Sequence, residues 1–160
     1  MSGRAYDIAA TVCDPELPML TLHDLGILRG VDDEGGRVIV TITPTYSGCP
    51  AMAEIRADIH RALTRAGYAD VDVRTVLAPP WSSDDITAEG RATLAAHGIA
   101  PPHRANNRTP LTLITRTSRP SCPQCGSSDT TTLSAFGATA CRDLHRCNAC
   151  LETFEQVKAI

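Results

Sequence analysis

Apolar residues recur along the first hundred positions with two periods, one typical of helices and one typical of strands. Within residues 50–66, four apolar side chains are spaced by three and four positions, and this spacing predicts an amphipathic helix. They are Met52, Ile55, Ile59 and Leu63. Pro50 suits the first helical position and Gly67 the position just after the helix.

Residues 37–43, RVIVTIT, alternate as a strand does, because every second residue from Val38 to Ile42 is apolar and falls on one face. The preceding segment GILRGV, residues 26–31, predicts a partner strand, and DDEGG (32–36) predicts a hairpin turn between them. Residues 70–77, DVDVRTVL, predict a third strand after the helix. A strand–helix–strand unit requires a right-handed crossover, so we expect a small mixed three-stranded sheet.

Two further helices complete this region. Residues 3–12 predict a short helix, and Ser83 or Asp84 can cap a last helix that runs to about His97. The order helix-strand-strand-helix-strand-helix indicates an α/β (α+β) domain. We therefore expect an α/β domain over residues 1–98, a proline-containing linker with room for one strand over 99–120, and a cysteine-rich module over 121–160.

Composition narrows the class of protein. The 160-residue chain is 42% hydrophobic and 21% charged with a net charge of −3, which is ordinary for a globular protein and does not favour general nucleic-acid or membrane binding. No apolar run approaches the roughly 20 residues of a membrane-spanning helix. The N-terminal residues lack the apolar core of a signal peptide, and we expect a cytoplasmic protein.

Five of the seven cysteines lie in the last 39 residues. Because no export signal is recognised and the number of cysteines is odd, we expect these clustered cysteines to bind a metal rather than to form disulfides. Two CxxC pairs, CPQC and CNAC, are separated by 21 residues. Such pairs place four thiolates in a tetrahedron, the arrangement that structural zinc prefers, and predict a zinc ribbon. The predicted ligands are Cys122, Cys125, Cys147 and Cys150. An all-thiolate iron site of rubredoxin type uses the same ligands.

The rest of this module fits a small ribbon. Residues 130–136 (TTTLSAF) and 152–160 (ETFEQVKAI) alternate as strands do. A module of about 40 residues is too small to fold on an apolar core alone, so a metal should supply much of its folding energy. We interpret the fifth cysteine, Cys141, as a small packed residue rather than a ligand, and His145 as unnecessary once four cysteines are in place.

The α/β region offers one further cysteine of interest. Cys49 precedes Pro50 and would be the N-cap of the predicted helix, where the helix dipole favours a thiolate. Spacing alone favours the simpler interpretation, that Cys49 is a small residue that caps a helix after a glycine turn. The acidic residues Asp14 and Glu16 of DPELP and Asp24 of HDLGI are candidate ligands, or else ordinary loop charges and caps. The only tryptophan, Trp81 in PPW, is interpreted as a packing anchor.

Taken together, DPELP, DLG and SGCP resemble the small domain of iron–sulfur cluster assembly proteins of the SufT kind. With TPTYSGCPAM, PPW and the CPxCG ribbon added, the ordered set of motifs resembles the PaaD family of phenylacetate-degradation proteins over nearly the whole chain. Relatives often have a second tryptophan after PPW, where this chain has Asp85, so any role of that ring is in doubt here.

This resemblance implies a non-catalytic accessory protein that matures or delivers an iron–sulfur cluster or metal to the phenylacetyl-CoA ring-epoxidase complex, especially to its iron–sulfur reductase. It also implies that Cys49 is the cluster or metal ligand, with Asp14, Glu16 and Asp24 as oxygen ligands or supporting groups. One cysteine cannot hold a cluster alone, which makes a homodimer that shares one across its interface an economical hypothesis.

Two other functions remain open at this point. The ribbon could hold iron and transfer electrons as rubredoxin does, or Cys49 could act as the nucleophile of a thiol enzyme with His23 or His60 as base. A zinc-ribbon nucleic-acid binder is disfavoured, because basic and acidic residues alternate in the module and no basic stripe forms.

Overall fold

The computed structural model describes residues 2–104 and 119–160. The chain divides into two compact units, which are described separately: Met1–Trp81 with Asp85–Gly90, and Ser82–Asp84 with Arg91–Ile160. Within the predicted linker, residues 105–118 lie outside the described residues, so the strand expected there does too.

The first unit is built on a three-stranded sheet in the order β1-β2-β3. β1 (Leu28–Glu34) and β2 (Arg37–Ile42) form an antiparallel hairpin, and β3 (Asp70–Thr75) pairs with β2 in parallel. Gly35 and Gly36 form the two-residue turn of the hairpin with φ of 64° and 95°, the left-handed conformation that such turns require. The predicted mixed three-stranded sheet is confirmed.

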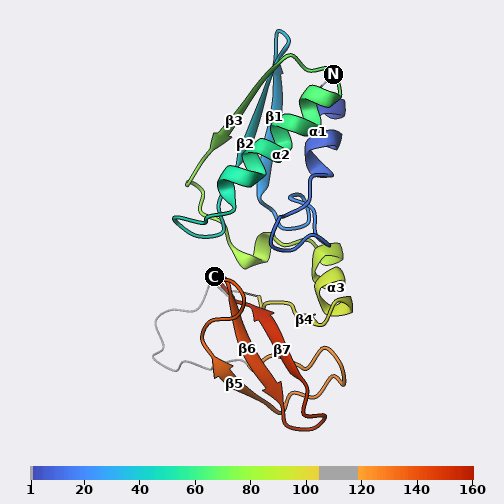
Figure 1. The fold of residues 1–160 in the computed structure, drawn as a ribbon, viewed down its shortest axis with the longest axis vertical. Coiled ribbons are helices and arrows are strands. Elements are labelled where there is room, and N and C mark those ends of the chain that lie inside the picture. Colours follow the sequence, from blue (N-terminus) through green and yellow to red (C-terminus); the bar gives the residue numbers. More distant parts are fainter. Residues whose placement is uncertain (1, 105–118) are drawn as a thin grey trace. The chain divides into compact units, whose positions relative to one another are not determined.

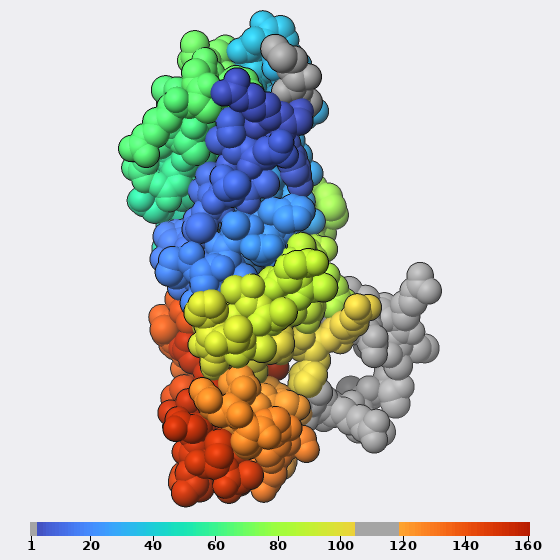
Figure 2. Space-filling view, turned by 90° about the vertical axis from the view of Figure 1, so that its right-hand side faces the viewer, coloured from blue at the N-terminus to red at the C-terminus, as the bar shows by residue number. Residues whose placement is uncertain are grey.

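Two helices, α1 (Ser2–Ala10) and α2 (Met52–Arg65), pack against each other and against the sheet (Figure 1). They lie side by side at the surface of this unit, blue and green in Figure 2. The buried stripe of α2 consists of Ile55, Ile59 and Leu63, at most 1% exposed, as the apolar period predicts. These side chains and the buried residues of β2 form one part of the core of this unit, and apolar residues of α1 and of the segment between α1 and β1 form another.

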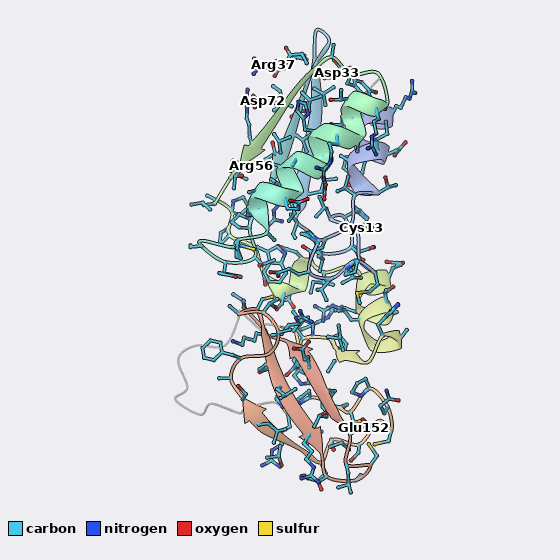
Figure 3. The ribbon with its side chains drawn as sticks, viewed as in Figure 1. Cys13, Asp33, Arg37, Arg56, Asp72 and Glu152 are labelled. Atoms are coloured by element: carbon cyan, nitrogen blue, oxygen red, sulfur yellow. The ribbon has the colours of Figure 1, made fainter. Side chains whose placement is uncertain are left out.

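Charged side chains mark β2 and β3 where the sheet is not buried. The Asp72 carboxylate accepts from the guanidinium of Arg37 at 3.0 Å and from that of Arg74 at 2.9 Å (Figure 3). Since β3 is an edge strand of this sheet, charges along it disfavour pairing with another chain.

The predicted start of the last helix is wrong, whereas its end is as predicted. Ser83–Asp85 forms a single 3-10 turn, and α3 begins only at Ala88 and ends at Ala96. Thr87 is the residue that caps it, because its Oγ1 accepts the backbone N–H of Gly90 at 3.0 Å. The N–H of Thr87 is itself held by the carbonyl of Asp24 at 2.9 Å, which separates the 3-10 turn from the helix.

The second unit contains a four-stranded sheet in the order β4-β7-β6-β5. β5 (Thr130–Ser134) and β7 (Thr153–Val157) occupy the segments in which alternation predicts strands. The strand β6 (Arg142–Cys147) between them has no apolar period in its sequence, RDLHRC, and was not predicted. β4 (Ile99–Ala100) pairs in parallel with β7.

The long charged and polar side chains of β6 are buried through specific partners. Arg142 is 8% exposed and forms a 2.6 Å ion pair with Glu155 on β7. His145 is 4% exposed, stacks on Phe154 and bonds Asp143 through Nε2 at 2.9 Å. These pairings explain why a strand of polar composition can occupy the centre of the sheet. Among the described residues, no helix has both the length and the apolar character of a membrane span.

Candidate functional site

The first CxxC pair forms a tight loop that ends on a glycine. The N–H of Gly126 donates to the carbonyl of Cys122 at 2.8 Å, and the N–H of Cys122 donates to the carbonyl of Ser127 at 2.9 Å. Gly126 has φ of +74°, a conformation that glycine adopts without steric penalty. We call this loop, residues 122–127, the first knuckle.

The second CxxC pair repeats the same hydrogen bonds. The N–H of Leu151 donates to the carbonyl of Cys147 at 3.1 Å, and the N–H of Cys147 donates to that of Glu152 at 2.8 Å. Leu151 therefore occupies the position of Gly126 and has φ of +66°, the one positive φ of a non-glycine residue within the described chain. Residues 147–152 form this second knuckle, which Glu152 ends (Figure 3).

The two knuckles bring four sulfurs together. Among the described residues, one group of three or more possible metal ligands is found, and its atoms all lie within 4.8 Å of one another: Cys122, Cys125, Cys147 and Cys150. The Sγ atoms of Cys122 and Cys150 are 3.7 Å apart, and those of Cys125 and Cys147 are 3.5 Å apart. A tetrahedron with metal–sulfur bonds of about 2.3 Å has sulfurs separated by about 3.8 Å, so the group fits one zinc-sized ion.

Two other potential metal ligands of the module, Cys141 and His145, lie outside the four-sulfur group. Cys141 is not part of the four-sulfur group, and its Sγ lies 3.1 Å from Oγ1 of Thr139. His145 uses Nε2 for Asp143, and its Nδ1 lies 3.4 Å from Oγ1 of Thr132. The arrangement is a closed site of four thiols from two knuckles.

Crowding and hydrogen bonds separate the pKa values of these thiols. The backbone N–H of Cys150, joined by that of Ala149, lowers the pKa of Cys147 to about 6. The pKa of Cys150 receives its largest contribution from the N–H of Glu152, which lowers it, but burial and the three neighbouring thiols together raise it to about 12. Four adjacent thiols therefore do not ionise together without a cation, and a divalent metal supplies the required charge.

The apolar core next to this site is small. A cluster of buried residues contains Ala100 and Phe154 together with the metal-site cysteines Cys122 and Cys147. Two of its four members are thus candidate ligands, so the metal site is continuous with part of the apolar core of this unit. A bound metal would therefore add to the stability of this region.

Cys49 lies in the loop between β2 and α2 and is partly exposed. Its N–H donates to the carbonyl of Tyr46 at 3.3 Å, and its carbonyl accepts the N–H of Met52 at 3.4 Å. The helix begins at Met52 with Ala51 as its N-cap, so the prediction of Cys49 as N-cap is wrong. Pro50 and Ala51 complete a turn before the helix, and the thiol lies just outside the helix N-terminus.

The acidic candidates are engaged in loop structure. Asp14 is 6% exposed, and its Oδ1 accepts the N–H groups of Glu16 and Leu17, both at 2.8 Å. Glu16 is half-buried in the same turn. Asp14 therefore shapes the DPELP loop through an Asx turn. Within the described chain, Cys49 and these carboxylates do not form a group of three or more ligand atoms.

Asp24 is engaged in the same way. Its Oδ2 accepts from the N–H and Oγ1 of Thr21 at 3.1 and 2.7 Å, and its Oδ1 accepts from Thr87 at 3.4 Å. Its backbone carbonyl also accepts the N–H of Thr87. Asp24 thus connects the turn after Thr21 to the residue that caps α3.

The DLG motif packs against Asp85, a relation that no local pattern predicts. The glycine of DLG, Gly26, has φ of +68°, and a Cβ there would lie 2.6 Å from the Cβ and carbonyl oxygen of Asp85. The Asp85 carboxylate pairs with Arg29 at 2.9 Å. Asp85, which follows the PPW motif in the chain, therefore forms an ion pair in this unit.

Comparison with known proteins agrees with this two-part organisation. Residues 8–76 match the family described as "Iron-sulfur cluster assembly protein", and residues 106–158 match the family described as "PaaD zinc beta ribbon domain". The first match contains Cys49 and all three acidic candidates, and the second contains all four ribbon cysteines. Fold and sites thus define a protein with an iron–sulfur assembly domain and a metal ribbon.

Individual relatives extend over different lengths of the chain. The chain is 39% identical to an Escherichia coli protein named as a putative 1,2-phenylacetyl-CoA epoxidase subunit, over 155 residues that cover 97% of this chain and 91% of that protein. It is 34% identical to an "Fe-S protein maturation auxiliary factor" of Porphyromonas gingivalis over 52% of this chain and 81% of that protein. The chain belongs to the PaaD family.

A solved structure supports the fold of the first unit. The crystal structure of a DUF59 domain from Bacillus anthracis superposes with a TM-score of 0.55 at 26% identity, covering 58% of this chain and 90% of that one. The resemblance to the SufT-type domain and to the PaaD family that the motifs indicate is confirmed by these matches.

Proposed function

We propose that this protein is an accessory factor that helps to mature or deliver an iron–sulfur cluster or metal to a phenylacetyl-CoA epoxidase complex. One observation carries the proposal: a single chain joins an iron–sulfur assembly domain with a partly exposed cysteine, Cys49, to a separate four-cysteine site. The names of its relatives, an epoxidase component and a maturation factor, support both parts of the role.

The four-cysteine site is assigned a structural role, with zinc as its metal. Two of its sulfurs, those of Cys122 and Cys147, are buried, and the set of four thiols is complete without a substrate or water ligand. A closed tetrahedral site of this kind stabilises a fold and does not exchange its metal readily. Zinc fits because it prefers thiolate ligands and carries no redox chemistry into the module.

Cys49 is assigned the transfer role, because its side chain is partly exposed, it lies outside the closed site, and it is the SGCP cysteine to which the family resemblance gives that role. The carboxylates of Asp14 and Asp24 accept backbone and hydroxyl hydrogen bonds, so we assign both residues to holding the loops around the first unit in shape. Glu16, half-buried in the Asp14 turn, remains a candidate oxygen ligand. A cluster needs more ligands than one cysteine supplies, and a second copy of the chain or the recipient's cysteines would complete them.

The proposed recipient is the iron–sulfur reductase of the epoxidase complex. A cluster is passed by exchange of thiolate ligands, which requires a donor cysteine that a partner can reach. Partly exposed Cys49 meets that requirement, whereas buried Cys122 and Cys147 do not.

The test is anaerobic purification of the epoxidase system with wild-type protein, with Cys49→Ser and with Cys13→Ser, followed by iron, zinc and sulfide analysis. Cys13 is a matched control because it is an exposed cysteine in the same unit, in the loop after α1 (Figure 3). We expect Cys49→Ser to keep its zinc and to leave the reductase deficient in iron and sulfide, and Cys13→Ser to behave as wild type. Full cluster content with Cys49→Ser would refute the transfer role.

Electron transfer is the second candidate, because the CPxCG sequence of the first knuckle is also found at iron sites of rubredoxin type. The same metal analysis distinguishes the two functions. One zinc per chain and a colourless ribbon support the accessory role, whereas one iron per chain with thiolate-to-iron charge-transfer bands supports electron transfer.

A further inference from the structure

The four-sulfur site depends on how its two knuckles are held relative to each other. Each knuckle fixes its own pair of sulfurs through its own backbone hydrogen bonds. The two short sulfur–sulfur distances, 3.7 and 3.5 Å, each join one cysteine of the first knuckle to one of the second. The spacing between the knuckles is therefore set by interactions outside them, among them the pairing of β5 with β6.

Asn148 is placed to set that spacing. It lies between the ligands Cys147 and Cys150, and its backbone N–H donates to the carbonyl of Asp129 at 2.9 Å. Its side-chain Nδ2 donates to Oδ1 of Asp129 at 2.9 Å and to Oγ1 of Thr131 at 3.1 Å. Asp129 lies two residues beyond the end of the first knuckle and directly precedes β5.

These bonds continue the sheet beyond the last strand pair. The register of β5 and β6 ends at Thr130 opposite Cys147, and the next residues on either side are Asp129 and Asn148. Main-chain pairing alone would leave this end to fray, since it adjoins two loops. The side-chain amide bonded to a carboxylate closes it, and a hydrogen bond to an ionised group is stronger than a neutral one.

We propose that Asn148 and Asp129 form a clamp that positions the two knuckles for metal binding, so that Asn148 is a positioning residue of the metal site although it is not a ligand. The inference rests on the metal site proposed above. Groups that orient metal ligands in this way typically change metal affinity by about 10–100-fold when they are replaced.

The test measures the affinity of the full-length protein for Zn²⁺ by competition with a chromophoric chelator, and the absorption spectrum of the Co²⁺-loaded protein. Asn148→Ala is expected to lower the affinity about tenfold while keeping the thiolate-to-cobalt charge-transfer bands of four sulfurs. Asn148→Asp places a carboxylate against that of Asp129 and is expected to lower the affinity further and to shift the cobalt d–d bands.

An exchange of the two residues gives the decisive comparison. In the double variant Asn148→Asp with Asp129→Asn, an amide again faces a carboxylate, and we expect most of the affinity and the wild-type d–d bands to return. The matched control is Ser134→Ala, which removes a hydrogen bond to the N–H of Phe136 at the other end of β5. This control is expected to leave the affinity within about threefold of wild type.

The proposal fails if Asn148→Ala changes the affinity less than about threefold, if Ser134→Ala lowers it as much, or if the exchange restores neither affinity nor spectrum. Wild-type protein that binds neither Zn²⁺ nor Co²⁺ would refute the metal site itself and the clamp with it. These outcomes separate failure of the clamp alone from failure of the proposed function.

Discussion

The indole Nε1 of Trp81 donates a 2.8 Å hydrogen bond to the backbone carbonyl of Leu25, although 56 residues separate the two in the chain. Trp81 is only 6% exposed, and Leu25 is the central residue of the DLG motif. The bond shows that the PPW and DLG motifs form one structural node of the first unit. An aliphatic side chain or phenylalanine at this place would have no donor for the Leu25 carbonyl.

Removal of this donor should destabilise the first unit. Trp81→Phe leaves a buried carbonyl without a partner and is expected to lower the free energy of unfolding by about 1–3 kcal/mol. Chemical denaturation followed by far-UV circular dichroism measures the effect. The control is Tyr6→Phe, which removes the exposed hydrogen bond between the Tyr6 hydroxyl and His23. If both variants lose the same small amount of stability, Trp81 acts by packing alone.

The close contact at Gly26 gives a second prediction. Gly26 and Gly35 have φ of +68° and +64°, so alanine costs about 1–2 kcal/mol in backbone conformation at either position. A Cβ at Gly35 meets nothing within 4 Å, whereas at Gly26 it would lie 2.6 Å from the backbone oxygen of Asp85. We expect Gly26→Ala to be more destabilising than Gly35→Ala by about another 1–3 kcal/mol in equilibrium unfolding. Equal losses would contradict the contact.

The second knuckle is strained at Leu151, and this strain can be relieved. Leu151 is 61% exposed, so its side chain contributes little packing, yet it adopts φ of +66°. Leu151→Gly is expected to stabilise the metal-loaded ribbon by about 0.5–1 kcal/mol, after allowance for the chain entropy of glycine. Gly126→Ala at the matching position of the first knuckle should have the opposite sign. Thermal unfolding of zinc-loaded protein tests both, and a loss of stability in Leu151→Gly would assign Leu151 a contact of its own.

Metal affinity should depend strongly on pH. The pKa of Cys150 is raised to about 12, so in the metal-free site this thiol keeps its proton through the neutral range and the metal must displace it. Affinity should therefore fall by at least about tenfold for each pH unit below neutrality. Cys147, with a pKa of about 6, is already ionised at neutral pH and adds a further proton only below that pKa, where the dependence becomes steeper. Chelator competition from mildly alkaline to mildly acidic pH measures this, and an affinity independent of pH would exclude thiolate ligation.

Periodic and spaced features were predictable from the sequence. The apolar period of α2, the alternation of β2 and the glycine turn between β1 and β2 each act within a few residues, so the chain determines them locally. The two CxxC pairs likewise determine the two knuckles of the ribbon locally, because the conformation of a knuckle depends only on a short run of its own residues. The four cysteines that the spacing selects are the four whose sulfurs the structure brings within 4.8 Å.

Features that rest on distant partners were not predictable. The strand β6 is polar in sequence. It is stable in the sheet because Glu155 on β7 forms an ion pair with Arg142 and Phe154 on β7 stacks on His145. The predicted start of α3 was too early because the carbonyl of Asp24, which is distant in the chain, holds the N–H of Thr87.

By itself, the sequence of this protein determined the periodic helices and strands of the first unit, where two metal knuckles form and which family motifs occur in order. Only the tertiary structure decided that Asp14 and Asp24 accept hydrogen bonds within the fold, that Cys49 lies before the helix rather than at its cap, and that Asn148 bonds Asp129. The reason is physical: a local pattern fixes backbone conformation, whereas the role of a polar side chain depends on the partners that folding brings to it.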